Sequence, residues 1–153
     1  MNLKKITLGL LILPASIWAQ VADLNQKIPN DPDVRIGKLD NGLTYYIRKN
    51  AKPEKKVDLR LVLNAGSILE SDKQLGLAHF MEHMVFNGTK TFPKNELISY
   101  LQSIGVKFGQ HLNAYTSFDE TVYFLPIPSD DPVKLDKGFQ ILEDWAFNAN
   151  LET

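Results

Sequence analysis

Hydrophobic and polar residues alternate along the first folded part of the chain, and this period of two predicts β-strands. Residues 34–39 and 43–48 alternate on either side of Asp40-Asn41-Gly42. An Asn-Gly pair between two alternating segments is a strong indication of a β-hairpin. Residues 57–63 carry an apolar side chain at every second position, which predicts a third strand with one face toward the core.

A helical spacing replaces the alternation after the third strand. Apolar residues recur every three or four positions over residues 75–85, shortly after Ser71 and Asp72. Serine and aspartate are good N-cap residues, so we expect a mostly buried helix that starts close to them. A second helix is expected over residues 93–103, because the segment begins with proline and is followed by Gly105, which can end it.

The last third of the chain predicts a strand pair and a final helix. Residues 106–116 and 121–125 have extended patterns, and residues 117–120 are expected to form the turn between them. Ser129-Asp130-Asp131-Pro132 is typical of a helix start. The expected apolar stripe of this helix consists of Leu135, Phe139, Leu142, Trp145, Ala146 and Ala149. These elements predict an α+β fold, with one mostly antiparallel sheet and helices packed on one face.

The first nineteen residues have the layout of a secretory signal peptide. Lys4-Lys5 precedes an apolar run over residues 6–17, and a small residue follows. This run is short and contains a proline, which disfavours a stable membrane anchor. We therefore expect export to the bacterial periplasm or the extracellular space. The expected organisation is a signal peptide, a polar linker over residues 20–33, and one domain over residues 34–153.

Composition narrows the range of functions. The chain has 153 residues, 44% hydrophobic and 23% charged, with a formal net charge of −1. This balance fits a globular domain, and the scattered lysines form no basic stripe, which argues against nucleic-acid binding. The chain has no cysteine. An exported domain without disulfides must obtain its stability from its core, a metal or a larger assembly.

The strongest chemical signal is the pentapeptide that contains His79, Glu82 and His83. On a helix, residues four apart lie on one face, so the two imidazoles can point at one metal ion. Two imidazoles and a third anionic ligand would leave zinc an open position for water, which a nearby carboxylate can deprotonate. The order H-x-x-E-H is that of the inverzincins. The alternative is a chance pattern on a solvated helix face.

Three linked motifs carry a resemblance to a known family. They are Asn64-Ala65-Gly66-Ser67, the segment 76–89 around the pentapeptide, and Leu112-Asn113-Ala114-Tyr115-Thr116. In this order they resemble the amino-terminal part of the M16 zinc proteases, the group of pitrilysin, insulin-degrading enzyme and mitochondrial processing peptidase. The resemblance extends from about residue 34 to the end of the chain.

The resemblance implies a fold and a set of roles. The fold would be the αβ roll of M16 domains, and a second M16-like domain or subunit would help to enclose the peptide substrate. His79 and His83 would bind Zn²⁺, and Glu82 would be the general base that activates the metal-bound water. Asn113 and Ala114 would lie on an edge strand that binds the substrate backbone as an added strand. Alternatively, Asn113 caps a turn and Ala114 only packs.

The third zinc ligand is the point where the sequence departs from the family pattern. In the family it is a glutamate roughly 70 to 80 residues after the second histidine. Glu143 and Glu152 follow His83 by 60 and 69 positions, and neither fits that spacing comfortably. His111 is expected to be a surface or second-shell histidine. We therefore expect the third ligand beyond Thr153, and an amino-terminal fragment that is inactive alone.

Two classes of function fit the sequence. The first is a zinc endopeptidase that hydrolyses peptides or unfolded segments. The second is a non-catalytic M16-like subunit with a binding or assembly role. The presence of all three residues His79, Glu82 and His83 favours the peptidase, because a subunit without catalysis has no need to keep them.

Overall fold

The computed structural model describes residues 26–93, 95–107, 109 and 113–151. The chain divides into two compact units, and the boundary between them in the sequence lies between Lys49 and Asn50. The predicted signal peptide and the first part of the predicted linker lie outside the described residues. Within the described part of the chain, no helix has both the length and the apolar character that a membrane crossing requires.

The first unit is a β-hairpin, as its Asn-Gly pair predicts. Strands β1 (Val34–Lys38) and β2 (Thr44–Arg48) pair antiparallel. Gly42 has a φ of +91°, a conformation that glycine adopts without strain, and its N–H donates to the Leu39 carbonyl at 2.9 Å. Among the described strands, β1 and β2 form a two-stranded sheet of their own. The described strands thus form two antiparallel sheets where the pattern predicted one, because an alternating pattern predicts a strand but not its pairing partner.

The second unit contains a three-stranded antiparallel sheet. Its strands are β3 (Lys56–Leu63), β4 (Asn113–Thr116) and β5 (Thr121–Pro128), in the order β3-β5-β4. The central strand β5 is buried along most of its length. Strand β4 is an edge among the described strands, so one side of its backbone is open to a further strand.

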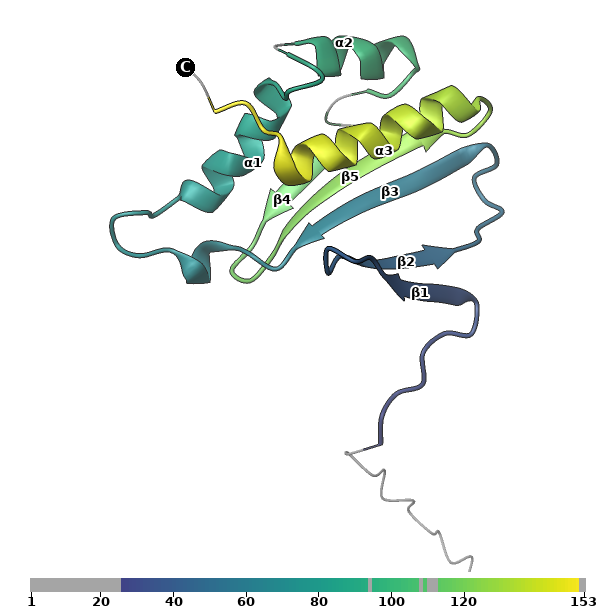
Figure 1. Cartoon of the computed structure of the whole chain (residues 1–153), viewed down its shortest axis with the longest axis horizontal. Helices are drawn as coiled ribbons and strands as arrows, with labels where there is room; N and C mark the ends of the chain where they lie inside the picture. Colours follow the sequence, from purple (N-terminus) through teal and green to yellow (C-terminus); the bar gives the residue numbers. More distant parts are fainter. Residues whose placement is uncertain (1–25, 94, 108, 110–112, 152–153) are drawn as a thin grey trace, which may run out of the picture. The chain divides into compact units, whose positions relative to one another are not determined.

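Three α-helices complete the second unit: α1 (Leu77–Asn87), α2 (Glu96–Ser103) and α3 (Pro132–Phe147). Helix α1 contacts β4 and β5, and α3 contacts β3 and β5, on the same face of the sheet (Figure 1). A short 3₁₀ helix (Ser67–Leu69) lies between β3 and α1. The predicted start of α3 is confirmed: the Asp131 side chain accepts from the Val133 N–H at 2.9 Å, and Pro132 is its first residue.

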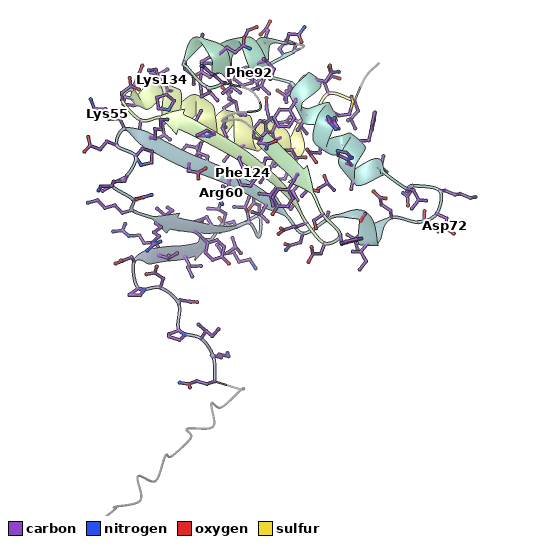
Figure 2. The ribbon with its side chains drawn as sticks, turned by 180° about the vertical axis from the view of Figure 1, so that it is seen from behind. Lys55, Arg60, Asp72, Phe92, Phe124 and Lys134 are labelled. Atoms are coloured by element: carbon purple, nitrogen blue, oxygen red, sulfur yellow. The ribbon has the colours of Figure 1, made fainter. Side chains whose placement is uncertain are left out.

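The core lies between the sheet and the helices. Leu125, Ile127 and Ile141 have no exposed surface. Helix α2 contributes Leu97 and Leu101, each of which is 1% exposed. The opposite face of the sheet is more open, and there the Arg60 guanidinium lies 5.0 Å from the centre of the Phe124 ring (Figure 2).

Several predicted boundaries and burial patterns are corrected. Helix α1 begins after Gly76 rather than near Ser71 and Asp72. Only its residues Glu82 and Val85 are buried, so the prediction of a mostly buried helix is wrong. Helix α2 begins at Glu96, three residues after the predicted start.

The buried stripe of α3 includes the predicted Trp145, and Leu142, Ala146 and Ala149 pack against the core, but the predicted Phe139 is not part of it. Phe139 is 54% exposed, whereas Gly138 is buried. A Cβ on Gly138 would lie 2.9 Å from Ile127 and 3.0 Å from Leu59. The helix therefore packs closely on the sheet at a glycine, a residue that a hydrophobic pattern does not count.

Candidate metal centre

The two histidines of the pentapeptide converge on one point. They lie one helical turn apart on α1, and their Nε2 atoms are 3.2 Å from each other. Two nitrogens bound to one tetrahedral zinc at about 2.0–2.1 Å would lie about 3.3–3.4 Å apart. His79 and His83 are both exposed, so an ion could reach them. Their donor type and spacing fit a zinc ion.

Glu82 lies on the same helix and is held against strand β4. It is 7% exposed, and its Oε2 accepts a hydrogen bond of 2.6 Å from the Thr116 hydroxyl on β4. The Tyr123 phenol lies nearby, and burial, followed by the negative charge of Glu82, raises the pKa of Tyr123 to about 12. The described partner of the carboxylate is thus a neutral hydroxyl. This arrangement suits a base better than a metal ligand.

The third ligand is not found among the described residues. Within residues 26–151, apart from the gaps named above, no three His, Cys, Asp or Glu side chains form a group that could hold a metal. Glu143, one of the late glutamates considered above, is exposed on α3 and belongs to no such group. His111 and Glu152 lie outside the described residues.

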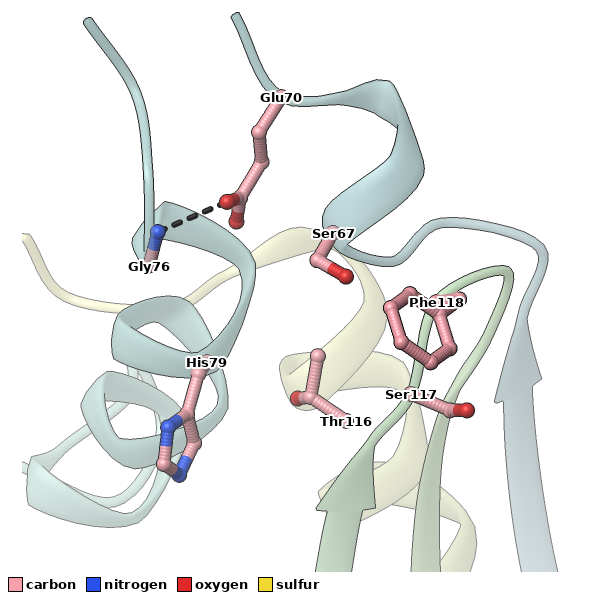
Figure 3. A pocket seen from close by; sticks show the side chains of 7 residues that line it. All are labelled: Ser67, Glu70, Gly76, His79, Thr116, Ser117 and Phe118. Atoms are coloured by element: carbon pink, nitrogen blue, oxygen red, sulfur yellow. Dashed lines mark hydrogen bonds between the residues drawn. The ribbon is translucent and has the colours of Figure 1, made fainter. Parts of the chain in front are cut away.

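The start of α1 is held by a residue that sequence reasoning missed. The Glu70 carboxylate accepts from the Gly76 N–H at 2.7 Å (Figure 3). It also accepts from the Ala78 N–H at 2.8 Å. These amides have no partner within the helix, and the helix dipole favours a negative charge there. An acidic residue several positions before the helix was the available signal. Glu70 fixes the turn from which His79 projects.

The other end of α1 is tied to α3 through a buried carboxylate. Asp144 is 2% exposed, and it accepts from the Thr89 hydroxyl at 2.6 Å and from the Thr91 N–H at 3.1 Å. The Thr91 hydroxyl and the Asn148 side chain donate to its second oxygen at 3.3 and 3.1 Å. The segment after α1 is therefore held against α3. Sequence reasoning missed this network, because the two threonines lie more than 50 positions from Asp144.

Strand β4 presents the backbone of specific residues at its open edge. Ser117 donates to the Glu120 carbonyl at 2.8 Å and closes the turn before β5. Counting back along the register, hydrogen-bonded pairs alternate with non-bonded pairs, so Ala114 and Thr116 direct their N–H and C=O groups away from β5. The Asn113 Oδ1 accepts from the Ala114 N–H at 3.0 Å. Both residues lie on the edge strand expected for them.

A pocket adjoins the candidate metal centre. It has a volume of about 330 Å³ and is lined by Ser67, Glu70, Gly76, His79, Thr116, Ser117 and Phe118 (Figure 3). It therefore joins the first turn of α1 to the end of β4. A side chain of a peptide paired with β4 would have room there.

The sequence of this chain matches a family model over most of its length. The model is that of Insulinase (Peptidase family M16), and the match covers residues 45–153. The chain belongs to the peptidase M16 family.

Individual M16 proteins agree with this assignment. The chain is 43% identical over 148 residues to the probable zinc protease PqqL of Haemophilus influenzae, covering 95% of this chain and 16% of that protein. It superimposes with a TM-score of 0.78 and 45% identity on the crystal structure of the first half of the periplasmic protease PqqL from Escherichia coli, covering 82% of this chain and 27% of that one. The predicted M16 fold is confirmed.

Not every similar protein is named as a peptidase. The chain is 33% identical over 141 residues to the cytochrome b-c1 complex subunit 1 of Bos taurus, covering 92% of this chain and 28% of that protein. The chain thus spans less than a third of the length of each of these relatives. Membership of the M16 family places this chain in a family of zinc proteases. Whether this chain takes part in catalysis depends on the residues of α1.

Proposed function

We propose that this chain carries the zinc-binding helix and the general base of a metalloendopeptidase that hydrolyses peptides or unfolded segments. The observation that carries the proposal is the 3.2 Å approach of the His79 and His83 Nε2 atoms, with Glu82 buried on the same helix and held by Thr116. Close relatives that are named zinc proteases support it.

The three side chains have separate tasks in this proposal. His79 and His83 would bind zinc through neutral nitrogens. Zinc, when bound, supplies a Lewis acid that acidifies water and polarises the scissile carbonyl. Glu82 takes the proton of the attacking water and passes it to the leaving amine nitrogen, as a general base and then a general acid. Its neutral hydroxyl partner on β4 leaves the carboxylate able to accept that proton.

The open edge of β4 is the proposed binding site for the substrate backbone. Ala114 directs its N–H and C=O groups away from β5, as an added strand requires. Such main-chain pairing tolerates many side-chain sequences. The Asn113 side chain already occupies the Ala114 N–H, so we infer that it moves when a peptide pairs with this edge.

The proposed site needs contributions from outside the described residues. A zinc site with an open position for water usually has three protein ligands, and α1 supplies two. We propose that the third is a glutamate in a segment beyond Thr153, and that residues 20–153 alone bind zinc weakly and do not hydrolyse peptides. A second M16-like domain or subunit would complete the substrate chamber. The periplasmic relative and the predicted signal peptide support export.

Metal analysis combined with peptide cleavage tests the proposal. The protein with all its domains should contain about one zinc ion for each His79–His83 pair and should cleave unstructured peptides. A chelator should abolish cleavage until zinc is restored. His83→Ala should lose both zinc and cleavage. His111→Ala is the matched control and should keep both. Full activity in His83→Ala would overturn the proposed ligand set.

A non-catalytic M16-like subunit is the alternative function, and the similarity to the cytochrome b-c1 complex subunit favours it. The same experiment separates the two. A folded protein that binds no zinc and cleaves no peptide, but co-purifies in a stable complex, would support the subunit role.

A further inference from the structure

Thr116 links the open strand edge to Glu82. It is the last residue of β4 and is partly buried. Its hydroxyl donates to the Glu82 Oε2 at 2.6 Å, a length typical of hydrogen bonds to a charged acceptor. Its backbone N–H and C=O groups face the edge away from β5, as derived above from the register. One residue therefore contacts both the base and the proposed substrate-binding edge.

The neighbouring threonine on β5 leaves this bond undisturbed. Thr121 pairs with Thr116 across the strands, and its hydroxyl donates to the Ala65 carbonyl at 2.9 Å, whereas the two hydroxyl oxygens are 3.4 Å apart. A hydroxyl has a single proton to donate. The Thr116 proton is directed to Glu82, because that contact is 2.6 Å long whereas the two hydroxyl oxygens are 3.4 Å apart.

The bond restricts how the Glu82 carboxylate can rotate. The last torsion of a glutamate side chain is broad, so an unheld carboxylate samples many orientations. A donor fixed on Oε2 defines the plane of the carboxylate and so the direction in which its other oxygen points. A general base must reach its proton at hydrogen-bond distance in the correct direction, and supporting residues of this kind determine whether it does.

We propose that Thr116 is a positioning residue for Glu82, and that it couples peptide binding at the β4 edge to the orientation of the base. This inference depends on the proposed peptidase function. When a peptide pairs with β4, it would hold the backbone of Thr116 in place, and the Thr116 hydroxyl would hold the Glu82 carboxylate. The end of β4 is then part of the machinery that orders the site.

Substitutions at Thr116 test the proposal in the complete, zinc-loaded protein. Thr116→Val keeps the shape of the side chain and removes the hydroxyl, and it should lower kcat by about 10- to 100-fold with KM within about threefold. Thr116→Ser keeps the hydroxyl and should restore kcat to within about threefold of the wild type. Zinc content should be unchanged in both. If the valine variant does not fold, Thr116→Ala takes its place.

Thr121→Val is the matched control, because it removes a threonine hydroxyl from the same cross-strand pair. It should lower the melting temperature through the lost bond to Ala65 and leave kcat within about threefold, since Thr121 directs its proton away from the Thr116 and Glu82 pair. A loss of kcat equal to that of Thr116→Val would indicate a general packing effect and would overturn the proposal.

Glu82→Gln provides the reference that separates the two levels of inference. If Glu82→Gln abolishes cleavage but Thr116→Val does not, the positioning role is wrong and the proposed function stands. If Thr116→Ser is as slow as Thr116→Val, the hydroxyl is not the cause and the positioning role is again wrong. If the wild type and Glu82→Gln turn over equally, the proposed function fails and the positioning role fails with it.

Discussion

Glu70 holds the first turn of the zinc-binding helix, and its removal should loosen that turn by a predictable amount. Its two carboxylate oxygens accept from the Gly76 and Ala78 N–H groups at 2.7 and 2.8 Å. Hydrogen bonds to a charged group contribute about 1.5–3 kcal/mol each, and replacing a helix N-cap side chain by alanine costs about 0.5–2 kcal/mol. Glu70 is only partly buried and its side chain is flexible, so we take about 1 kcal/mol for each bond and about 2 kcal/mol for both, the upper end of the cap range.

Two substitutions divide this contribution. Glu70→Gln keeps one acceptor oxygen and presents an NH₂ group to the second N–H, so about 1 kcal/mol should be lost. Glu70→Ala loses both bonds, about 2 kcal/mol. Since about 1.4 kcal/mol corresponds to a tenfold change in an equilibrium, amide exchange in the first turn of α1 should accelerate about fivefold and about 30-fold, respectively.

Hydrogen exchange measured by mass spectrometry on peptides that cover residues 74–81 gives these rates. Glu96→Gln is the matched control: Glu96 also lies in the first turn of a helix and is exposed, so its charge favours α2 by less than about 1 kcal/mol and should not affect α1. Unchanged exchange in Glu70→Ala would refute the reasoning. An equal acceleration in Glu96→Gln would show that charge alone, rather than the two bonds, is responsible.

Three further predictions concern stability. Asp144→Asn replaces a carboxylate oxygen that accepts hydrogen bonds by an NH₂ group, so it should lower the free energy of unfolding by about 1–3 kcal/mol, measured by thermal unfolding. The control Asp136→Asn, at an exposed position, should have little effect, and equal melting curves for the two variants would contradict the prediction. Gly66→Ala would place a Cβ 2.3 Å from the Ser117 carbonyl oxygen, so it should lower the melting temperature clearly, and a neutral effect would show that the turn can move aside. The pKa of Tyr123 is raised to about 12 in the folded protein from about 10 in the unfolded chain. Its contribution to the free energy of unfolding is therefore complete below about pH 10 and is lost as the pH rises toward about 12. Unfolding midpoints measured from about pH 9 to 12 should fall less in Tyr123→Phe than in the wild type, and parallel curves would refute the raised pKa.

Local features of the site could be predicted from the sequence, because they depend on neighbouring residues. The convergence of His79 and His83 follows from the four-residue spacing on a helix. The hairpin of β1 and β2 follows from the Asn-Gly pair and the alternation on either side. In both cases the geometry is set within about fifteen residues of chain.

Long-range features could not be predicted in the same way. The bond from Thr116 to Glu82 joins residues 34 positions apart and requires the position of β4 relative to α1. The tie between Thr89 and Asp144 spans 55 positions. Single-residue preferences contain no information about such contacts.

The most direct test of the account is the pairing of zinc content with peptide turnover in Glu82→Gln, measured in the protein with all its domains. Because the Glu82 carboxylate accepts a hydrogen bond from the Thr116 hydroxyl and is proposed as the base rather than a ligand, glutamine should leave zinc at the wild-type stoichiometry. Hydrolysis should fall by at least about 100-fold, the lower end of the contribution of a general base. Wild-type turnover with zinc retained would contradict the central claim that Glu82 is the base. Loss of zinc would instead make Glu82 a ligand.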